Sequence, residues 1–240
     1  MSLKPAKYSD IKKLEERMQS KRRNFEKKYK LPSPTLIISE GTKTEPHYIQ
    51  GLVDLIIKKY SEINKNARHS MKDIIKIHGT GRNTKGLLKY ARDLAAKPEN
   101  KHYKRIWIMY DKDDFPLDNF DNTQFSIEDK ECDDADRKFF AAWSNECIEL
   151  WFILHFQDLI SDVGREQYKE ILKAYLDYDK AASDIYDIID KNEKSSVDLA
   201  ISRAKKLYES YDNKTAPSKM VPATRVYELV EELRGYLNES

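Results

Sequence analysis

Four short apolar runs divide the first two thirds of the chain. Each run is too short for a typical helix, and each is rich in β-branched or aromatic residues, as is usual for a buried strand. The four predicted strands are Thr35–Ser39, Asp73–His78, Arg105–Tyr110 and Lys138–Trp143. Between them, apolar residues recur at the spacing of an amphipathic helix. This pattern predicts helices near Glu45–Tyr60, from the turn at 79–84 to the residue before Pro98, near Asn119–Cys132, and after Ser144–Asn145, which would cap the last one.

A strand followed by a helix, four times over, predicts an α/β fold. Parallel neighbouring strands need a helical crossover, so this order gives a mostly parallel four-stranded sheet flanked by helices. From Gln167 onward the pattern is helical only, with breaks at Pro217 and Pro222. We therefore expect a basic N-terminal arm or helix over 1–33, the α/β domain over 34–160, and an α-helical C-terminal extension over 161–240 packed on the core.

Charge is distributed unevenly along the chain. The net charge of the whole chain is +2, whereas the first thirty residues carry eleven Lys or Arg against four acids, a net +7. The rest of the chain is therefore −5. A basic arm ahead of an acidic body suits a phosphate-bearing partner such as nucleic acid. The alternative is that Ile11–Tyr29 forms a charged surface helix with many i,i+4 pairs and no ligand.

Cysteine usage and hydropathy point to a protein of a reducing, aqueous compartment. Cys132 and Cys147 have no CxxC spacing, so both are predicted to be reduced core thiols. The longest apolar stretch, Cys147–Phe156, contains Glu149 and is shorter than the ~20 residues that span a bilayer. The N-terminus has no apolar signal region. These features predict a cytoplasmic protein without a membrane partner.

Acidic residues directly follow the first and third predicted strands. Glu40 follows the first, and Asp111, Asp113 and Asp114 follow the third. The carboxyl ends of parallel strands meet in the crevice where open α/β sheets bind ligands, so we expect these carboxylates to converge. In an extended chain the D-x-D spacing would point Asp111 and Asp113 the same way, toward one Mg²⁺ or Mn²⁺ ion. An ordinary acidic turn is the alternative, and Glu40 on a separate strand argues against it.

Four blocks of sequence connect these acidic residues to a known family. They are residues 36–48 (LIISEGTKTEPHY), 78–84 (HGTGRNT), 107–115 (WIMYDKDDF) and 144–156 (SNECIELWFILHF). In this order they resemble the RloB family, over roughly residues 34–235. The resemblance implies that 34–160 is a Toprim-like catalytic domain, the magnesium-dependent fold shared by topoisomerases, primases and the nucleases of the overcoming-lysogenization-defect type.

The same resemblance implies roles for particular residues. Glu40 would be the general acid or base, and Asp111 and Asp113 would hold metal. Glu45 and Glu149 are this chain's candidates for the further metal-binding acids of the related nucleases, although the spacing around residue 144 departs from theirs and leaves the number of metals open. The family is also associated with bacterial anti-phage defence and is often encoded beside an ATPase partner.

The glycine-rich turn after the second predicted strand is a candidate phosphate site. Gly79, Thr80 and Gly81 precede a helix and could present backbone N–H groups, with Arg82 adding a bidentate contact. The turn lacks the spacing and the Lys-Ser/Thr ending of a P-loop. A plain strand-to-helix turn is the alternative.

Further basic and histidine side chains are weaker candidates. Lys43, close to Glu40, and Lys180, in a tyrosine-rich segment, could contact nucleic acid or could be ordinary exposed lysines. His78 and His155 end apolar runs and could be catalytic, although a hydrogen-bonded histidine inside the fold is the more common case.

These observations favour an Mg²⁺- or Mn²⁺-dependent Toprim-type endonuclease that hydrolyses phosphodiester bonds. A topoisomerase would need a domain with a nucleophilic tyrosine, and a primase a nucleotide site; neither is recognisable. One alternative is a non-catalytic Mg/nucleotide-binding or nucleic-acid-binding regulatory subunit of an ATPase defence complex, and another is nucleic-acid binding by the basic arm alone. The choice between DNA and RNA stays open, with tRNA favoured by family analogy, as does the oligomeric state.

Overall fold

Five strands form one sheet at the centre of the protein. The computed structural model describes residues 8–28, 31–63, 73–82, 84–113, 117–134 and 136–238. The strands are β1 (Thr35–Ser39), β2 (Ile75–Gly79), β3 (Arg105–Asp111), β4 (Lys138–Asn145) and β5 (Ala223–Thr224). They are arranged in the order β2-β1-β3-β4-β5, with the first four parallel and β5 antiparallel to β4. The register places Ser39 beside Gly79 and Met109, so the carboxyl ends of the central strands lie at one edge.

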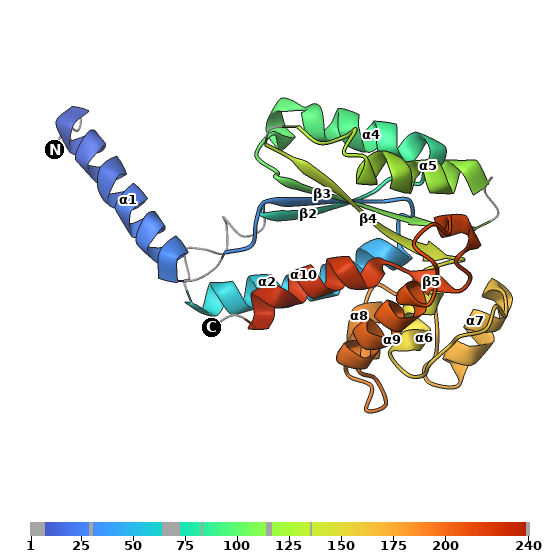
Figure 1. The fold of residues 1–240 in the computed structure, drawn as a ribbon. Coiled ribbons are helices and arrows are strands. Elements are labelled where there is room, and N and C mark those ends of the chain that lie inside the picture. The colour runs from blue at the N-terminus through green and yellow to red at the C-terminus, as the bar shows by residue number, and fades with distance from the viewer. Residues whose placement is uncertain are drawn as a thin grey trace.

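Helices cover both faces of this sheet (Figure 1). On one face lie α4 (Thr84–Ala96) and α5 (Leu117–Glu128), and on the other α2 (Thr44–Ile63) and α10 (Val226–Asn238). The shorter helices are α6 (Glu149–Leu154), α7 (Arg165–Lys173), α8 (Ile185–Asp190) and α9 (Val197–Glu209), with the 3₁₀ turns η1 (Pro98–Asn100) and η2 (Pro217–Lys219). The basic helix α1 (Tyr8–Lys28) extends away from this body.

Alternating side chains of the central strands fill two separate cores. Leu36 and Ile38 belong to the core beneath α4 and α5, whereas Ile37 belongs to the core on the α2 side. All three side chains are fully buried. Burial on both faces explains why these strands are continuous apolar runs rather than alternating ones.

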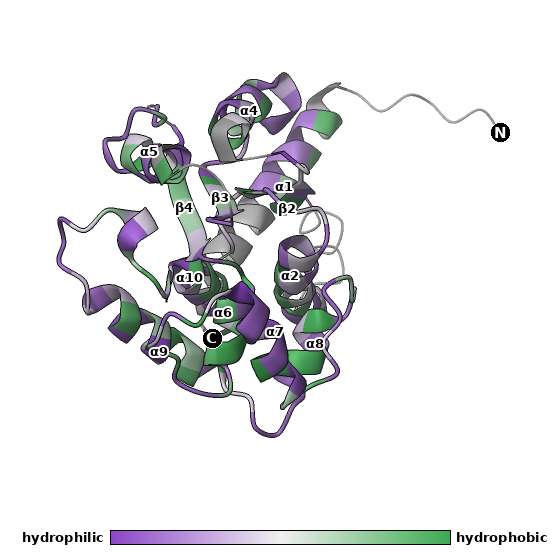
Figure 2. Cartoon of the chain, turned by 90° about the vertical axis from the view of Figure 1, so that its right-hand side faces the viewer, coloured by the Kyte–Doolittle hydropathy of each residue, from purple (hydrophilic) through white to green (hydrophobic). Residues whose placement is uncertain are grey.

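The C-terminal helices complete the core on the α2 side. Tyr168 from α7, Ala200 from α9 and Leu229 from α10 are buried in the same cluster as Tyr48 and Trp151. Seen from the carboxyl ends of the strands, these helices lie around α6, and each carries both hydrophilic and hydrophobic residues (Figure 2). This packing brings loops of the C-terminal region up to the strand ends.

The structure corrects two predictions about the sheet. It has a fifth strand, because the two residues Ala223–Thr224 pair with the end of β4. Ser144 and Asn145 do not cap a helix but continue β4: Ser144 Oγ lies 3.0 Å from Thr224 Oγ1, and Asn145 donates its side-chain N–H to Pro217 O at 3.1 Å. Contacts with a distant segment therefore decided the conformation of these two polar residues.

Candidate metal centre and active site

A pocket of about 410 Å³ opens at the carboxyl ends of β1 and β3. The turn after β1 forms one wall, the end of β3 forms another, and a loop of the C-terminal region forms a third. Its lining residues are Glu40, Gly41, Thr42, Lys43, Thr44, Glu45, Asp111, Asp113, Asp179, Lys180 and Ala181. The predicted residues Glu40, Lys43, Glu45, Asp111, Asp113 and Lys180 therefore meet at one place.

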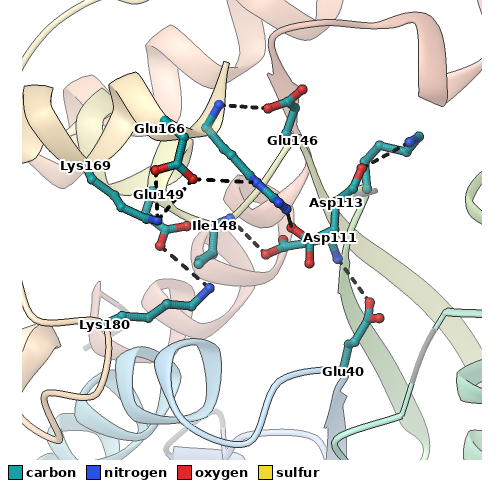
Figure 3. A network of polar contacts seen from close by, with 11 residues as sticks. Glu40, Asp111, Asp113, Glu146, Ile148, Glu149, Glu166, Lys169 and Lys180 are labelled. Atoms are coloured by element: carbon teal, nitrogen blue, oxygen red, sulfur yellow. Dashed lines mark hydrogen bonds and ion pairs between the residues drawn. The ribbon is translucent and has the colours of Figure 1, made fainter. Parts of the chain in front are cut away.

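Glu40 and Asp111 come together because β1 and β3 are neighbours in the sheet. The backbone N–H of Asp111 donates to Glu40 Oε2 at 3.4 Å, and Asp111 Oδ2 accepts from the backbone N–H of Ile148 at 3.1 Å. Figure 3 shows both carboxylates on the same side of the strand ends. Asp111 is 7% exposed, so its carboxylate is held in a largely desolvated place.

Asp113 lies in the pocket, but its backbone conformation differs from the extended one that was predicted. It does not continue the strand but has a left-handed backbone with φ of 39°, a conformation that Asp tolerates better than most residues. Its N–H donates to Glu146 O at 3.1 Å, and its carboxylate accepts from Arg165 Nη1 at 3.2 Å. The alternation of side chains along a strand is therefore not what brings Asp111 and Asp113 together.

Glu45 lies in the first turn of α2 and folds back on the turn after β1. A Cβ on Gly41 would lie 2.3 Å from Glu45 Oε2, so residue 41 must be glycine for the carboxylate to lie where it does. The side chain of Glu45 is 7% exposed. This close approach explains one of the glycines near the site.

Glu149 lies behind the pocket at the start of α6 and is 1% exposed. Its Oε1 accepts from the Tyr178 hydroxyl at 2.7 Å and lies 3.9 Å from Lys180 Nζ. Its Oε2 is buried and has no hydrogen-bond partner within the described part of the chain. A buried carboxylate oxygen without a partner is costly and indicates a missing cation or donor.

The carboxylates repel one another. Burial, followed by the charges of Glu45, Glu149 and Asp113, raises the pKa of Asp111 well above its ordinary value. Burial also raises the pKa of Glu45, with contributions from Glu149 and Asp113 that the nearby Lys180 opposes. Burial alone would lower the pKa of Lys180, but the same carboxylates raise it. The pocket therefore has a surplus of negative charge that Lys180 and Arg165 offset only in part.

The chemistry of this site fits a hard divalent cation. Carboxylate oxygens are preferred ligands of Mg²⁺ and Mn²⁺, and both the surplus charge and the unpartnered oxygen of Glu149 would be relieved by one. Within the described ranges, however, no three His, Cys, Asp or Glu side chains lie in a ready-made cluster that could hold an ion. Asp113 is instead paired with Arg165, and a cation that binds Asp113 would have to replace this ion pair. Asp114, the remaining carboxylate expected at the strand ends, lies outside the described residues.

The glycine-rich turn borders the site, but its N–H groups are engaged. Thr80 and Gly81 donate to the carbonyl oxygens of Ser39 and Glu40, both at 2.9 Å, and Arg82 donates its N–H to Thr80 Oγ1 at 3.1 Å. A phosphate nest built from these backbone groups, as predicted for Gly79–Arg82, does not match this arrangement. The turn instead holds the backbone of Glu40 in place.

Neither candidate histidine lies in the pocket lining. His155 is 3% exposed, lies 3.1 Å from the Tyr48 hydroxyl, and contacts Ser195 Oγ at 3.3 Å. Burial lowers its pKa to about 3, so it is a neutral core residue. His78 Nε2 lies 2.7 Å from the Tyr90 hydroxyl. His155 is therefore a hydrogen-bonded histidine inside the fold, the alternative to a catalytic role.

Asp179, Arg165 and Glu146 are among the residues of this site that were not predicted. Asp179 lines the pocket, Arg165 pairs with Asp113, and Glu146 accepts N–H groups of Lys112 and Asp113 through its carbonyl. Asp179 adjoins Lys180, so that tyrosine-rich segment was a partial signal. Arg165 is the first residue of α7, and Glu146 lies between β4 and α6. Nothing local in the sequence marks either residue as part of a site.

The fold and the pocket together define an α/β protein with an acidic site at the carboxyl edge of a mostly parallel sheet. The chain belongs to the RloB-like protein family, whose model matches residues 35–233. The match covers the sheet and the C-terminal helices together. No curated protein and no solved structure matches the chain. Among the helices of the described ranges, none combines the length and hydropathy needed to cross a bilayer.

Proposed function

We propose that this protein is a metal-dependent nuclease that hydrolyses phosphodiester bonds of nucleic acid. The observation that carries this proposal is the convergence of Glu40, Glu45, Asp111 and Asp113 in one pocket, with the buried Glu149 behind it. Burying like charges together is unfavourable for folding, and functional sites are where proteins retain such arrangements. The proposed setting, by family analogy, is cytoplasmic anti-phage defence beside an ATPase partner.

In this proposal Mg²⁺ or Mn²⁺ would be held by Glu40, Asp111 and Asp113, supported by Glu45 and Glu149. When bound, the ion would neutralise charge that develops on the phosphoryl and leaving oxygens. Glu40 is the proposed proton-transfer group, because the N–H of Asp111 fixes its carboxylate at the pocket wall.

Cationic side chains around the acidic pocket would draw in the substrate. Lys43 and Lys180 both line the pocket and can attract phosphate oxygens. Arg165 would serve the same purpose once a metal ion has taken over Asp113, because its guanidinium can bind a phosphate in bidentate fashion. The substrate would thus meet positive charge at the rim and the metal ion at the centre.

The test is a cleavage assay with tRNA, single-stranded RNA, plasmid and single-stranded DNA, in Mg²⁺ or Mn²⁺, with and without a neighbouring ATPase. Wild-type protein should cleave at least one substrate only when metal is present. Glu40→Gln and Asp111→Asn should each lower the rate by about 100-fold or more, because each removes a group that acts on the reacting atoms.

The matched control for these variants is Glu170→Gln, an exposed carboxylate on α7 that pairs with Lys173. Its cleavage rate should equal that of the wild type, and all variants should keep the wild-type circular dichroism spectrum. Metal-independent cleavage, or full activity in both site variants, would remove this mechanism.

A second candidate function is a non-catalytic subunit that binds Mg-nucleotide or nucleic acid. The ion pairs of Asp113 with Arg165 and of Glu149 with Lys180 favour it, because they compensate part of the charge without metal. Binding of Mg-nucleotide without turnover, and without cleavage in the presence of the ATPase, would select this function over the nuclease.

A further inference from the structure

A stacked group of side chains lies beside the acidic pocket, between the edge strand β2 and helix α4. The rings of His78 and Tyr90 are 5.7 Å apart at an interplanar angle of 22°, and His78 Nε2 lies 2.7 Å from the Tyr90 hydroxyl. The guanidinium carbon of Arg82 lies 4.5 Å from the centre of the Tyr90 ring. The arrangement places the guanidinium of an exposed arginine over an aromatic ring.

The surroundings of this group are positively charged. Lys76 on β2 and Lys97 after α4 are both exposed. Burial, and then the charges of Lys76 and Lys97, lower the pKa of His78. His78 is therefore a neutral partner for the Tyr90 hydroxyl at neutral pH, while the arginine and the lysines carry the charge. A row of cations interleaved with aromatic rings is the usual surface for single-stranded nucleic acid.

The turn that carries Arg82 lies against the turn that lines the acidic pocket. The turn that carries Arg82 is bonded to the turn that carries Glu40, through the N–H of Gly81 and the carbonyl of Glu40 at 2.9 Å. The two turns are also in close contact, because a Cβ on Gly79 would lie 2.7 Å from Gly41 O. A strand bound at the pocket could therefore pass directly to Arg82 and along β2.

We infer that Lys76, His78, Arg82, Tyr90 and Lys97, named here the β2–α4 surface, bind an unpaired segment of the nucleic-acid substrate as it leaves the acidic pocket. A base stacks on the outer face of the Arg82 guanidinium, which Tyr90 holds in place from the other side. The phosphates beyond that base, on the side away from the pocket, lie near Lys76 and Lys97. The inference rests on the proposed nuclease function and adds that the substrate is single-stranded beside the cleavage site.

The stacked group favours an unpaired strand over two other ligands. A duplex keeps its bases stacked inside the helix, so it has no base to offer to Arg82. An acidic peptide would pair with the cations through its carboxylates, but a chain of acidic residues has no ring to stack on the Arg82 guanidinium. Both ligands are included in the test as competitors.

The test is fluorescence anisotropy with labelled single-stranded RNA and DNA and the matched duplexes, in EDTA so that cleavage does not occur. Arg82→Gln should weaken single-strand binding on the order of tenfold, as expected for loss of one stacked base. Arg82→Lys should recover little of this loss, because it restores the charge but not the planar group. Lys76→Gln with Lys97→Gln should make the slope of log affinity against log salt shallower by about 1 to 2.

The matched control is Lys205→Gln, on the opposite side of the sheet. Lys205 lies 5.9 Å from the Tyr227 ring and pairs with Glu231, so its loss removes a similar cation from the other side of the molecule. Its effect on binding should be less than about twofold. Circular dichroism spectra should be the same for all variants.

Three outcomes would overturn the inference: an affinity for duplex equal to that for single strands, full binding by Arg82→Gln, or full recovery by Arg82→Lys. Displacement of the single strand by a poly-glutamate peptide at equal charge concentration would point to a peptide ligand instead. If Arg82→Gln binds normally while Glu40→Gln still abolishes cleavage, the role inferred for the β2–α4 surface is wrong and the proposed nuclease function stands. If the wild type neither binds nor cleaves nucleic acid, the proposed function fails with it.

Discussion

The two ends of strand β3 handle charge in opposite ways. At its start, Arg105 forms a two-point ion pair with Glu232 of α10, through Nε at 2.6 Å and through Nη2, and its guanidinium lies 4.1 Å from the Phe140 ring centre. At its end, Asp111 lies buried among other carboxylates, and its pKa is raised. The charges at the first end are paired and serve the fold, whereas those at the second are in surplus.

This difference separates structural charge from functional charge within one element. Arg105 joins the sheet to the last helix of the chain and gains a charge-assisted hydrogen bond for each donor it uses. Asp111 gains one backbone hydrogen bond from Ile148 but faces the repulsion of its neighbours. Such repulsion is unfavourable for folding unless a cation binds, so it indicates a site that is retained for binding.

The largest effect on stability is expected at the paired end. Glu232→Gln leaves the half-buried Arg105 without its charged partner and should lower the free energy of unfolding by about 2–4 kcal/mol. Thermal unfolding should then occur roughly 5–15 °C lower. The neighbouring Glu231→Gln breaks only the exposed pair with Lys205 and should cost less than about 1 kcal/mol. Equal losses in the two variants would contradict a structural role for the Arg105 pair.

At the carboxyl end of β3, the same carboxylate-to-amide change should raise the free energy of unfolding instead of lowering it. Asp111→Asn removes a buried charge from among like charges and keeps an oxygen for the N–H of Ile148. Without metal, the variant should be more stable by on the order of 1 kcal/mol, or about 2–4 °C in differential scanning calorimetry. Glu170→Gln is the control with no expected change. A loss of stability in Asp111→Asn would mean that its charge is already compensated.

The stability gained by Asp111→Asn should depend on pH, and the direction of this smaller effect follows from the pKa of Asp111. The folded-state pKa of Asp111 is raised above its unfolded value, so the favourable contribution of the neutral acid is complete at low pH and is lost as pH rises through the folded pKa. The stability difference between Asp111→Asn and the wild type should therefore approach zero in acid and grow toward neutral pH. Melting curves from about pH 4 to pH 8 will measure it. A stability difference that is largest in acid would contradict a raised pKa of Asp111 as its cause.

The sheet could be predicted closely because its signal is local. The strands at 35–39 and 105–111 are β-branched apolar runs between polar residues, and they were placed to within a residue. The pairing of β5 could not be predicted, since two residues after Pro222 have no pattern of their own. Ser144 and Asn145 were mistaken for a helix cap because their partners, Thr224 and Pro217, lie more than seventy residues away.

Only the part of the site that lies at the strand ends could be predicted from the sequence. Parallel topology alone brings Glu40 and Asp111 to neighbouring strand ends. Asp179 and Arg165 reach the pocket because the C-terminal helices pack on the α2 side, and their positions depend on long-range contacts. For the same reason, the stacking of Arg82 on Tyr90 could not be inferred from a turn that looked like a phosphate nest.

The central claim is that the carboxylates at the strand ends form a site for a divalent cation. Calorimetric titration of the metal-free protein with Mn²⁺ tests it most directly. The wild type should bind Mn²⁺, Asp111→Asn and Glu40→Gln should each weaken binding by about tenfold or more, and Glu170→Gln should bind as the wild type does. Wild-type protein that binds no Mn²⁺, or equal binding by Asp111→Asn, would contradict the claim.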